Sequence, residues 1–394
     1  MRIAMFSTDF PVLPPFFDRR SPKEWWGGVG KVAFRLALGM SERGHEVEVF
    51  ATHPLPKRHD VRLKGLKLHL FPADFQLSQT YVSLRFMRSL PSARPDVVHA
   101  HDGSPPGLIA GWNCSRRLNA PLVVTFHAQL YLDHRGLGAA VLLRSFARLE
   151  HRILRDSRSV IALTEVAKFS RPLSPWRSKV KVIPNGVDVG VRQSPDAKLL
   201  AKAALGIPAS TQLCLFVGAL NRRKGVDVLL EAAHLVSRAR PVIFVVVGKS
   251  IGKPNSTESK VRTDVNGRVH FEGFVEDTAM PTYFQAADLL VIPSRLEGFP
   301  LAMLEGFAVG LPVVASNIEP HREIIQDGRN GILFQTGDAT DLAAKIEGTL
   351  RGTELTSQLS ENSFESSRQF TWKRVLDETE SLYTLVSGQG NGCG

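Results

Sequence analysis

Short apolar runs alternate with helix-like patterns along almost the whole chain, and this alternation limits the folds open to it. Strands separated by helices are typical of βαβ units and parallel sheets. The strands expected in the first half are Arg2–Thr8, Glu46–Thr52, Val97–His101, Leu122–His127, Ser159–Thr164 and Lys179–Pro184. Those expected in the second half are Gln212–Gly218, Pro241–Gly248, Arg268–Phe274, Ala287–Ser294, Leu311–Ser316 and Gly331–Phe334. The sequence therefore predicts an α/β protein.

A chain of 394 residues is longer than one compact core usually holds, so we expect two domains. The polar stretch 188–211 has no strong apolar pattern and is interpreted as the linker. We expect two doubly wound, Rossmann-like domains, 1–190 and 191–370, which face each other across a cleft. A helix over 371–386 is expected to pack back toward the first domain, and 387–394 to form a flexible tail.

Positive charge is concentrated in the first half of the chain. Residues 1–190 contain 28 Lys and Arg against 15 Asp and Glu, a net charge of +13. Residues 191–394 have a net charge of −2, and the whole chain has +11. This asymmetry predicts an anionic partner. Five arginines share a helical pattern with apolar residues between them: Arg144, Arg148, Arg152, Arg155 and Arg158. A basic amphipathic helix is typical of peripheral membrane proteins; a merely solvated basic face is the alternative.

The sequence shows no sign of secretion or of a membrane span. Cys114, Cys214 and Cys393 have neither metal-ligand spacing nor a disulfide framework, which favours a reducing cytosol. The first apolar run is interrupted at Asp9, so we interpret it as a strand and not a signal peptide. The longest apolar tract contains Glu305 and two prolines, which argues against a transmembrane helix. We expect a cytoplasmic protein, with peripheral attachment to the membrane as a further hypothesis.

Two glutamates, Glu297 and Glu305, lie among apolar residues beyond the expected strand 287–294. A buried carboxylate needs partners, because removing it from water costs several kcal/mol or more. Pro300 suits the first turn of a helix and Gly310 its end. Glu297 therefore falls at the carboxyl end of a strand, where open α/β sheets bind ligands. Ribose or hexose hydroxyls would satisfy these carboxylates; a simple interaction with the helix dipole is the alternative.

Two glycine-containing loops could approach a phosphate. The turn Gly27–Lys31 opens a helix, whose first amides can bind an anion. It is neither a Walker A loop, since Val32 replaces Ser or Thr, nor a full dinucleotide fingerprint, and a plain tight turn is the alternative. The loop 218–225 follows a strand and carries three consecutive cations, 222–224. It suits a diphosphate, with a solvated basic loop as the alternative.

Three histidines end two neighbouring strands: His127 ends one, and His99 and His101 end the other. Such histidines can be general bases, metal ligands or hydrogen-bonded scaffolding. Asp102 is the one carboxylate close to them in the sequence and no cysteine is near, so a metal site is not expected.

Together these segments resemble the family-4 retaining glycosyltransferases of the GT-B fold over nearly the whole chain. The matching segments are Gly27–Gly30, Pro95–His101, Thr125–His127, Ile183–Asp188, the Arg-Lys-Gly loop at 223–225, His270–Val275, and Glu297 with Glu305. The resemblance implies that domain 1–190 binds the acceptor and domain 191–370 the nucleotide sugar. It implies a hexosyltransferase that retains the anomeric configuration, with a UDP- or GDP-sugar as donor. The implied acceptor is a lipid-linked or surface glycan, or a glycolipid; nucleic acid is not expected as a partner.

The resemblance also implies roles for individual residues. Glu305 would bind the ribose hydroxyls, and Glu297 would contact the sugar that is transferred. Arg223 and Lys224 would hold the diphosphate and stabilise the charge on the leaving group, so neither Mg²⁺ nor another cofactor is expected. His127 would lie near the C6 hydroxyl of the sugar and the acceptor.

Other donor-site positions follow from the same resemblance. Gly28 would offer its amide to the phosphates and Val275 would lie at the nucleobase. The remaining implied donor-site residues are Gly218, Phe299, Pro300 and Leu301. The chain departs from the family at Ala219, where an arginine is common, and at Pro300, where a glycine is common. A sugar-nucleotide epimerase or hydrolase on the same fold, and a non-catalytic sugar- or polyanion-binding module, are the alternatives.

Overall fold

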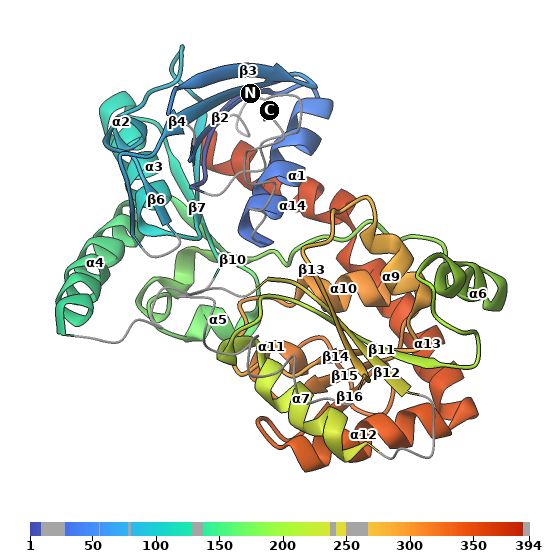
Figure 1. The fold of residues 1–394 in the computed structure, drawn as a ribbon. Helices are drawn as coiled ribbons and strands as arrows, with labels where there is room; N and C mark the ends of the chain where they lie inside the picture. The colour runs from blue at the N-terminus through green and yellow to red at the C-terminus, as the bar shows by residue number, and fades with distance from the viewer. Residues whose placement is uncertain are drawn as a thin grey trace. The chain divides into compact units, whose positions relative to one another are not determined.

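The computed structural model describes residues 1–8, 28–54, 56–77, 80–127, 137–236, 242–249 and 267–388, with 137–145 described by their backbone. The chain divides into two compact units, each described here by itself (Figure 1). The first unit comprises Met1–Asn185 together with Lys373–Gly394, and the second comprises Gly186–Trp372. The C-terminal segment thus belongs to the same unit as the N-terminal half.

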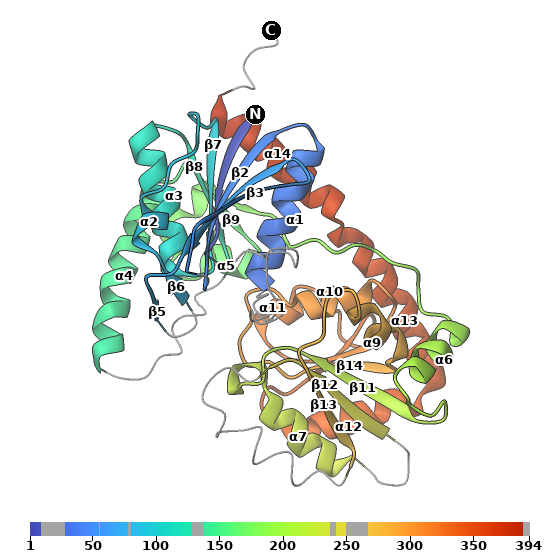
Figure 2. The same ribbon diagram turned by 45° about the horizontal axis from the view of Figure 1, so that its top comes forward.

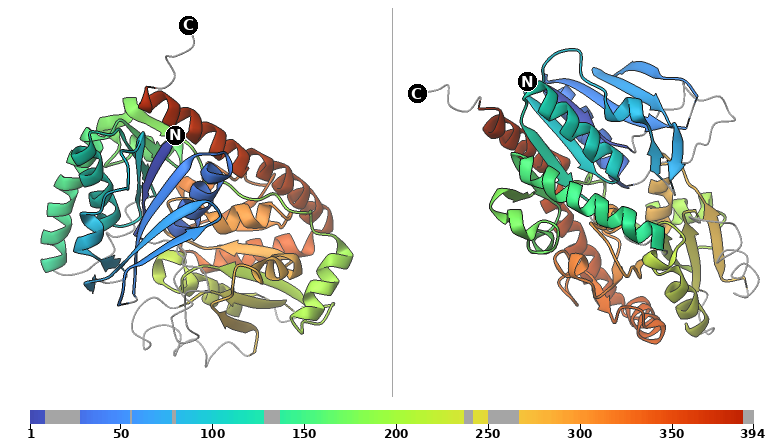
Figure 3. Two further views of the ribbon diagram at one scale, coloured as in Figure 1. Left: turned by 90° about the horizontal axis from the view of Figure 1, so that it is seen from above. Right: turned by 90° about the vertical axis from the view of Figure 1, so that its left-hand side faces the viewer.

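The first unit is built on an eight-stranded sheet in the order β10-β9-β8-β7-β1-β2-β4-β3. Its strands are β1 Arg2–Phe6, β2 Glu46–His53, β3 His59–Leu63, β4 Leu66–Pro72, β7 Val97–Asp102, β8 Leu122–Phe126, β9 Ser159–Ala162 and β10 Val180–Val182. A separate hairpin pairs β5 Phe75–Leu77 with β6 Thr80–Val82. The helices are α1 Gly28–Glu42, α2 Leu84–Met87, α3 Pro105–Leu118, α4 Leu137–Asp156, α5 Glu165–Phe169, η3 Ser174–Lys179 and α14 Trp372–Ser387. Helices α3 and α4 cover one face of the sheet, and α1 and α14 the other (Figures 2 and 3).

The second unit contains a six-stranded parallel sheet in the order β13-β12-β11-β14-β15-β16. Its strands are β11 Gln212–Val217, β12 Val242–Val247, β13 Val269–Gly273, β14 Leu289–Ile292, β15 Val313–Ser316 and β16 Ile332–Phe334. Its helices are α6 Pro195–Ala204, η4 Arg222–Lys224, α7 Val226–Leu235, α9 Met280–Ala286, α10 Leu301–Phe307, α11 Glu319–Arg322, α12 Ala339–Arg351, α13 Thr353–Ser367 and η5 Arg368–Phe370. Helices α9 and α10 pack on one face and α7 and α12 on the other, which buries an apolar cluster on each side (Figure 2).

The strands expected from the sequence are all present. The structure adds the hairpin β3–β4, which was not expected; its turn is Lys64–Gly65, whose positive φ values of 47° and 84° suit a tight two-residue connection. The interpretation of 188–211 as a linker is wrong, because this stretch contains α6. Ser194 caps this helix by accepting a hydrogen bond from the amide of Ala197, and Lys202 of α6 pairs with Asp288 of the same unit.

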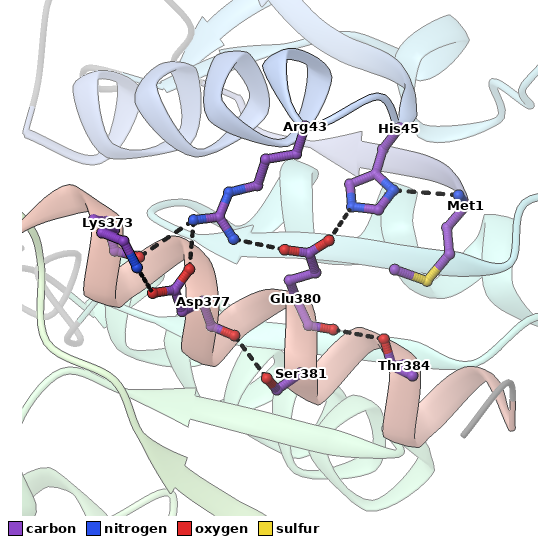
Figure 4. A network of polar contacts seen from close by, with 8 residues as sticks. All are labelled: Met1, Arg43, His45, Lys373, Asp377, Glu380, Ser381 and Thr384. Atoms are coloured by element: carbon purple, nitrogen blue, oxygen red, sulfur yellow. Dashed lines mark hydrogen bonds and ion pairs between the residues drawn. The ribbon is translucent and has the colours of Figure 1, made fainter. Parts of the chain in front are cut away.

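Helix α14 is fastened to the end of α1 by a charged network (Figure 4). Arg43 donates to Glu380 and to Asp377, each at 2.6 Å. His45 bonds to the other oxygen of Glu380 at 2.8 Å, and its second ring nitrogen lies 3.2 Å from the amino group of Met1. The network therefore ties the C-terminal helix to the first residues of the chain.

We expect Arg43→Ala to lower the free energy of unfolding by about 1 kcal/mol, because two partly exposed carboxylates lose a charged donor. Burial would raise the pKa of Glu380, but its bonds to Arg43 and His45 hold that pKa below the usual value. The stabilisation is therefore present above the ordinary carboxyl pKa and is lost as the pH falls through the lowered one.

Urea unfolding of wild type and variant at neutral and acidic pH tests this prediction. The stability difference should shrink on acidification. The control is Arg374→Ala, which removes an exposed i,i+4 pair with Glu378 on the same helix and should change stability less. Equal losses in the two variants would contradict an anchoring role for Arg43.

Candidate active site

The loops that follow β11 and β14 lie against each other at the carboxyl edge of the second sheet. Asn221 begins the first loop by accepting a hydrogen bond from the amide of Lys224 at 2.9 Å. Gly225 ends it with φ of +71°, and a Cβ atom there would lie 1.9 Å from the carbonyl oxygen of Pro293. The amide of Arg295 donates to the carbonyl of Arg223 at 2.7 Å. The two loops therefore form one joined surface, which the glycine allows.

Glu297 is the buried carboxylate of this surface. Its Oε1 accepts from Lys224 Nζ at 2.6 Å and from the Ser294 hydroxyl at 2.7 Å. Its Oε2 lies 3.8 Å from Arg223 Nη1. Burial would raise the pKa of Glu297, but the Lys224 ammonium, with His321 and the Ser294 hydroxyl, holds it below the usual value. Glu297 is therefore ionised at neutral pH.

The two cations that face Glu297 remain reachable from solvent. The side chains of Arg223 and Lys224 are 17% and 22% exposed, against 5% for Glu297. Arg223 also donates to the carbonyl of Leu296 at 3.2 Å. One carboxylate thus orients two cations without cancelling both charges, and the surface keeps a net positive charge that suits an anion.

His321 is a site residue that the sequence reasoning missed. It lies buried in α11, and its Nδ1 is 2.8 Å from the carbonyl of Ser316, the last residue of β15. The Ser316 hydroxyl in turn donates to the carbonyl of Ser294. Ser316 ends an expected strand, and this is the signal that could have drawn attention to the segment.

The remaining predicted donor residues lie around these loops. Glu305 is half-buried within α10, so the expectation of a buried pair is confirmed for Glu297 and wrong for Glu305. Pro300 directly precedes Leu301, the first residue of that helix. The ring of Phe299 lies 6.2 Å from that of Phe370.

Val275 and Gly218 follow the strands β13 and β11, whose carboxyl ends lie at the same edge of the second sheet. Val275 comes shortly after β13 and packs against the apolar cluster beneath α9 and α10. Gly218 follows β11 and is approached closely by Gly248, where a Cβ atom would lie 1.8 Å from the Gly218 oxygen.

Gly28 and His127 belong to the first unit, unlike the other predicted site residues. Gly28 is exposed at the first position of α1; Gly27 lies outside the described residues. His127 directly follows β8, is buried, and bonds through Nε2 to Nδ1 of His101 at 2.9 Å. Burial lowers the pKa of His127 to about 3, so its ring is neutral at physiological pH.

Asp102 does not join these histidines as a ligand. It follows His101 in β7, so the pleat sends its side chain to the opposite face of the sheet. Burial and the neighbouring Glu150 carboxyl raise the pKa of Asp102 well above its ordinary value. Within the described ranges, no group of three or more His, Cys, Asp and Glu side chains is arranged to hold a metal ion.

Sequence comparisons match both units. The family model described as "Glycosyltransferase Family 4" covers residues 26–191, and "Glycosyl transferases group 1" covers 198–366. The D-inositol 3-phosphate glycosyltransferase of Nocardiopsis dassonvillei is 30% identical over 388 residues, which cover 91% of this chain and 89% of that protein. The phosphatidyl-myo-inositol mannosyltransferase of Mycolicibacterium smegmatis is 28% identical, with 92% of each chain covered.

Solved structures share the fold. The sucrose-phosphate synthase of Thermosynechococcus elongatus has a TM-score of 0.79 at 22% identity, with 98% of this chain and 99% of that chain covered. The Anabaena protein HepE in complex with UDP-glucose has a TM-score of 0.74 at 21% identity, with 98% and 100% covered. Together with the two family matches, these findings show that the chain belongs to the family-4 glycosyltransferases and has the GT-B fold.

Proposed function

We propose that the chain is a retaining hexosyltransferase that uses a nucleotide-diphosphate sugar and needs no metal ion. The observation that carries this proposal is the pair of reachable cations, Arg223 and Lys224, which the buried Glu297 orients at the carboxyl edge of a parallel sheet. Such a pair neutralises a diphosphate and stabilises the negative charge that develops as it leaves. Open α/β sheets bind nucleotides at this edge.

Each carboxylate has a separate task in this proposal. Because Lys224 and Ser294 already occupy Oε1 of Glu297, its Oε2 is the atom that accepts a hydrogen bond from a sugar hydroxyl. Glu305 is half-buried on α10 and accepts from the ribose hydroxyls. Val275 contacts the base, and the backbone at Gly218 and at 299–301 lines the phosphates. Gly28 and His127 are residues of the first unit, and their roles stay predictions from the family resemblance.

The donor proposed is a UDP-sugar, and the acceptor carries a phosphate. HepE is described in complex with UDP and with UDP-glucose, which favours UDP over GDP. Relatives are named for inositol 3-phosphate and phosphatidylinositol, both phosphate-bearing acceptors. The first half of this chain carries a net charge of +13, which favours an anionic acceptor of this kind.

Thermal unfolding with UDP, GDP and ADP, then with their sugars, tests the donor. A ligand present at a hundredfold excess over its Kd stabilises the protein by about 2.7 kcal/mol. We expect UDP to stabilise most, and UDP release from UDP-sugar to require an inositol phosphate or glycolipid acceptor and to persist in EDTA. Release without acceptor would point to the hydrolase alternative, and binding without turnover to the non-catalytic one. An inverted anomeric configuration in the product would refute retention.

Glu305→Gln is expected to weaken UDP binding about tenfold, because the amide keeps the size but loses the charge that strengthens a hydrogen bond to ribose. Calorimetry with UDP measures the change. Glu365→Gln, an exposed carboxylate on α13, is the matched control and should bind UDP like wild type. Unchanged affinity in Glu305→Gln would remove its assignment to the ribose.

We also propose that α4 attaches the protein to an anionic lipid surface. Within 146–156 the predicted amphipathic pattern is confirmed, since Phe146, Ile153 and Leu154 are buried. The arginines of the same stretch are exposed, and Arg152 lies 5.6 Å from the ring centre of Trp112. Within the described ranges, no helix is long and apolar enough to cross a bilayer.

Replacing Arg148, Arg152 and Arg155 with alanine is expected to weaken binding to phosphatidylglycerol vesicles about a hundredfold, because each cation contributes about 1 kcal/mol. Wild-type binding should fade as salt is raised. A variant with three exposed arginines of the second unit replaced, Arg329, Arg351 and Arg368, is the charge-matched control. Equally weakened vesicle binding in both variants, or wild-type binding that does not depend on lipid charge, would contradict the proposal.

A further inference from the structure

Three histidine rings are stacked along one face of the first sheet. β7 and β8 are parallel neighbours, with His99 opposite Val123 and His101 opposite Thr125. Alternate residues of a strand share a face, so His99 and His101 lie on the same side. The ring centres of His99 and His101 are 4.5 Å apart, and those of His101 and His127 are 5.3 Å apart.

The ring of His101 reaches His127 through one nitrogen and leaves the other unbonded. Nδ1 of His101 lies 2.9 Å from Nε2 of His127. Nε2 of His101 is buried, and among the residues that the structure describes it has no hydrogen-bond partner. Burial lowers the pKa of His127 to about 3 and that of His101 well below its ordinary value. Both rings are therefore neutral, and a single proton lies between them.

This proton is bound either to Nε2 of His127 or to Nδ1 of His101. If it is bound to His127, then His101 is protonated at Nε2, which leaves a buried N–H without an acceptor. If it is bound to Nδ1 of His101, then Nε2 of His101 carries a lone pair without a donor. Orphaned buried N–H groups are rarer in proteins than under-satisfied acceptors, so the second arrangement is favoured.

We propose that His101 is a positioning residue that fixes His127 in the tautomer protonated at Nδ1. The Nδ1–H of His127 is then the group offered to a ligand, and it donates a hydrogen bond to a sugar or acceptor oxygen. In this form His127 does not accept a proton at Nδ1, so it is a donor and not a general base. The identity of the ligand rests on the proposed glycosyl transfer; the tautomer does not.

His99 and Tyr383 hold the stack in place. His99 Nδ1 is 2.5 Å from the hydroxyl of Tyr383, and its Nε2 is 2.7 Å from that of Thr125. Both nitrogens are thus engaged, and the ring that covers His101 cannot turn. Because Tyr383 lies on α14, the C-terminal helix contributes to the orientation of His127.

Nuclear magnetic resonance of protein labelled with ¹⁵N in its histidines tests the tautomer directly, since protonated and bare ring nitrogens resonate in separate regions. In wild type we expect His127 protonated at Nδ1, and protonation at Nε2 would overturn the proposal. His101→Asn keeps an amide donor near the position of Nδ1 and should preserve this form. His101→Leu removes the donor and should shift His127 to the Nε2–H form; an unchanged spectrum would refute the role of His101.

Activity provides a second, separable readout. At position 127, the amide nitrogen of an asparagine would lie near the position of histidine Nδ1, and that of a glutamine near the position of histidine Nε2. We therefore expect His127→Asn to retain at least about tenfold more glycosyl transfer than His127→Gln, a difference of about 1.4 kcal/mol. His234→Asn, at an exposed histidine of α7, is the control and should match wild type. Greater activity in the glutamine variant would overturn the donor role. Absence of transfer in wild type would refute the proposed function and leave the spectrum as the test of the tautomer.

Discussion

Lys224→Met is expected to lower kcat/KM for glycosyl transfer about a thousandfold, because a cation that stabilises the leaving diphosphate is lost. It should also lower the free energy of unfolding by about 3 kcal/mol, since it leaves the buried Glu297 without the partner at 2.6 Å. The pKa of Glu297 is held low by Lys224, so the stabilisation is present above the ordinary value of 4.5 and is lost as the pH falls through the lowered pKa. The stability difference between wild type and variant should therefore shrink in acid.

Lys202→Met separates catalysis from stability in this experiment. Lys202 is another lysine of the second unit that pairs with a carboxylate; its ammonium lies 2.7 Å from Asp288, and its side chain is 4% exposed. It has no place in the proposed donor site. We expect a comparable loss of stability by urea unfolding, but kcat/KM per folded molecule close to that of wild type. Similar losses of turnover in both variants would mean that Lys224 acts through stability alone.

The strands could be predicted because each is a short apolar run between turn residues. β14 is an example: its four residues are all buried, as a strand inside a parallel sheet must be. The hairpin β3–β4 was missed at its edge strand. β3 lies at the edge of the sheet and alternates half-buried and exposed residues, so its apolar signal is weak, whereas β4 alternates buried and half-buried residues.

The ion pair of Glu297 with Lys224 could not be derived from local pattern. The two residues follow β14 and β11, which are neighbours in the sheet although β12 and β13 lie between them in the sequence. Strand order depends on long-range packing, so the apolar pattern placed each residue at a strand end but did not pair them. The resemblance to a family placed both residues in one donor site, but it did not predict their ion pair.

The contact of His101 with His127 was closer to prediction. β7 and β8 are consecutive strands joined by one helix, and such strands usually lie side by side. The two-residue period then sends His99 and His101 to one face. The bond of Tyr383 to His99 could not be predicted from the sequence. Tyr383 lies on α14, and the pattern of that helix does not indicate which face of the sheet it packs on.

Gly225→Ala is expected to destabilise the second unit by about 3 kcal/mol or more and to abolish UDP binding. The residue has φ of +71°, which costs a side chain about 1 to 2 kcal/mol. The added Cβ would also lie 1.9 Å from the oxygen and 2.6 Å from the carbon of the Pro293 carbonyl, and backbone cannot yield as a side chain does. Relief of this clash separates the loop of Arg223 and Lys224 from the loop of Glu297.

Gly206 provides the matched control, because it has φ of +69° and nothing within 4 Å of an added Cβ. Gly206→Ala should therefore show the backbone strain alone, about 1 to 2 kcal/mol, with UDP binding intact. Asparagine tolerates positive φ better than alanine, so Gly206→Asn should be milder still, whereas Gly225→Asn should be as damaging as Gly225→Ala because its Cβ meets the same carbonyl. Urea unfolding and calorimetry with UDP measure all four variants. UDP binding by Gly225→Asn would contradict this explanation. It would mean that the donor site needs the positive φ of Gly225, and not the close packing of the two loops.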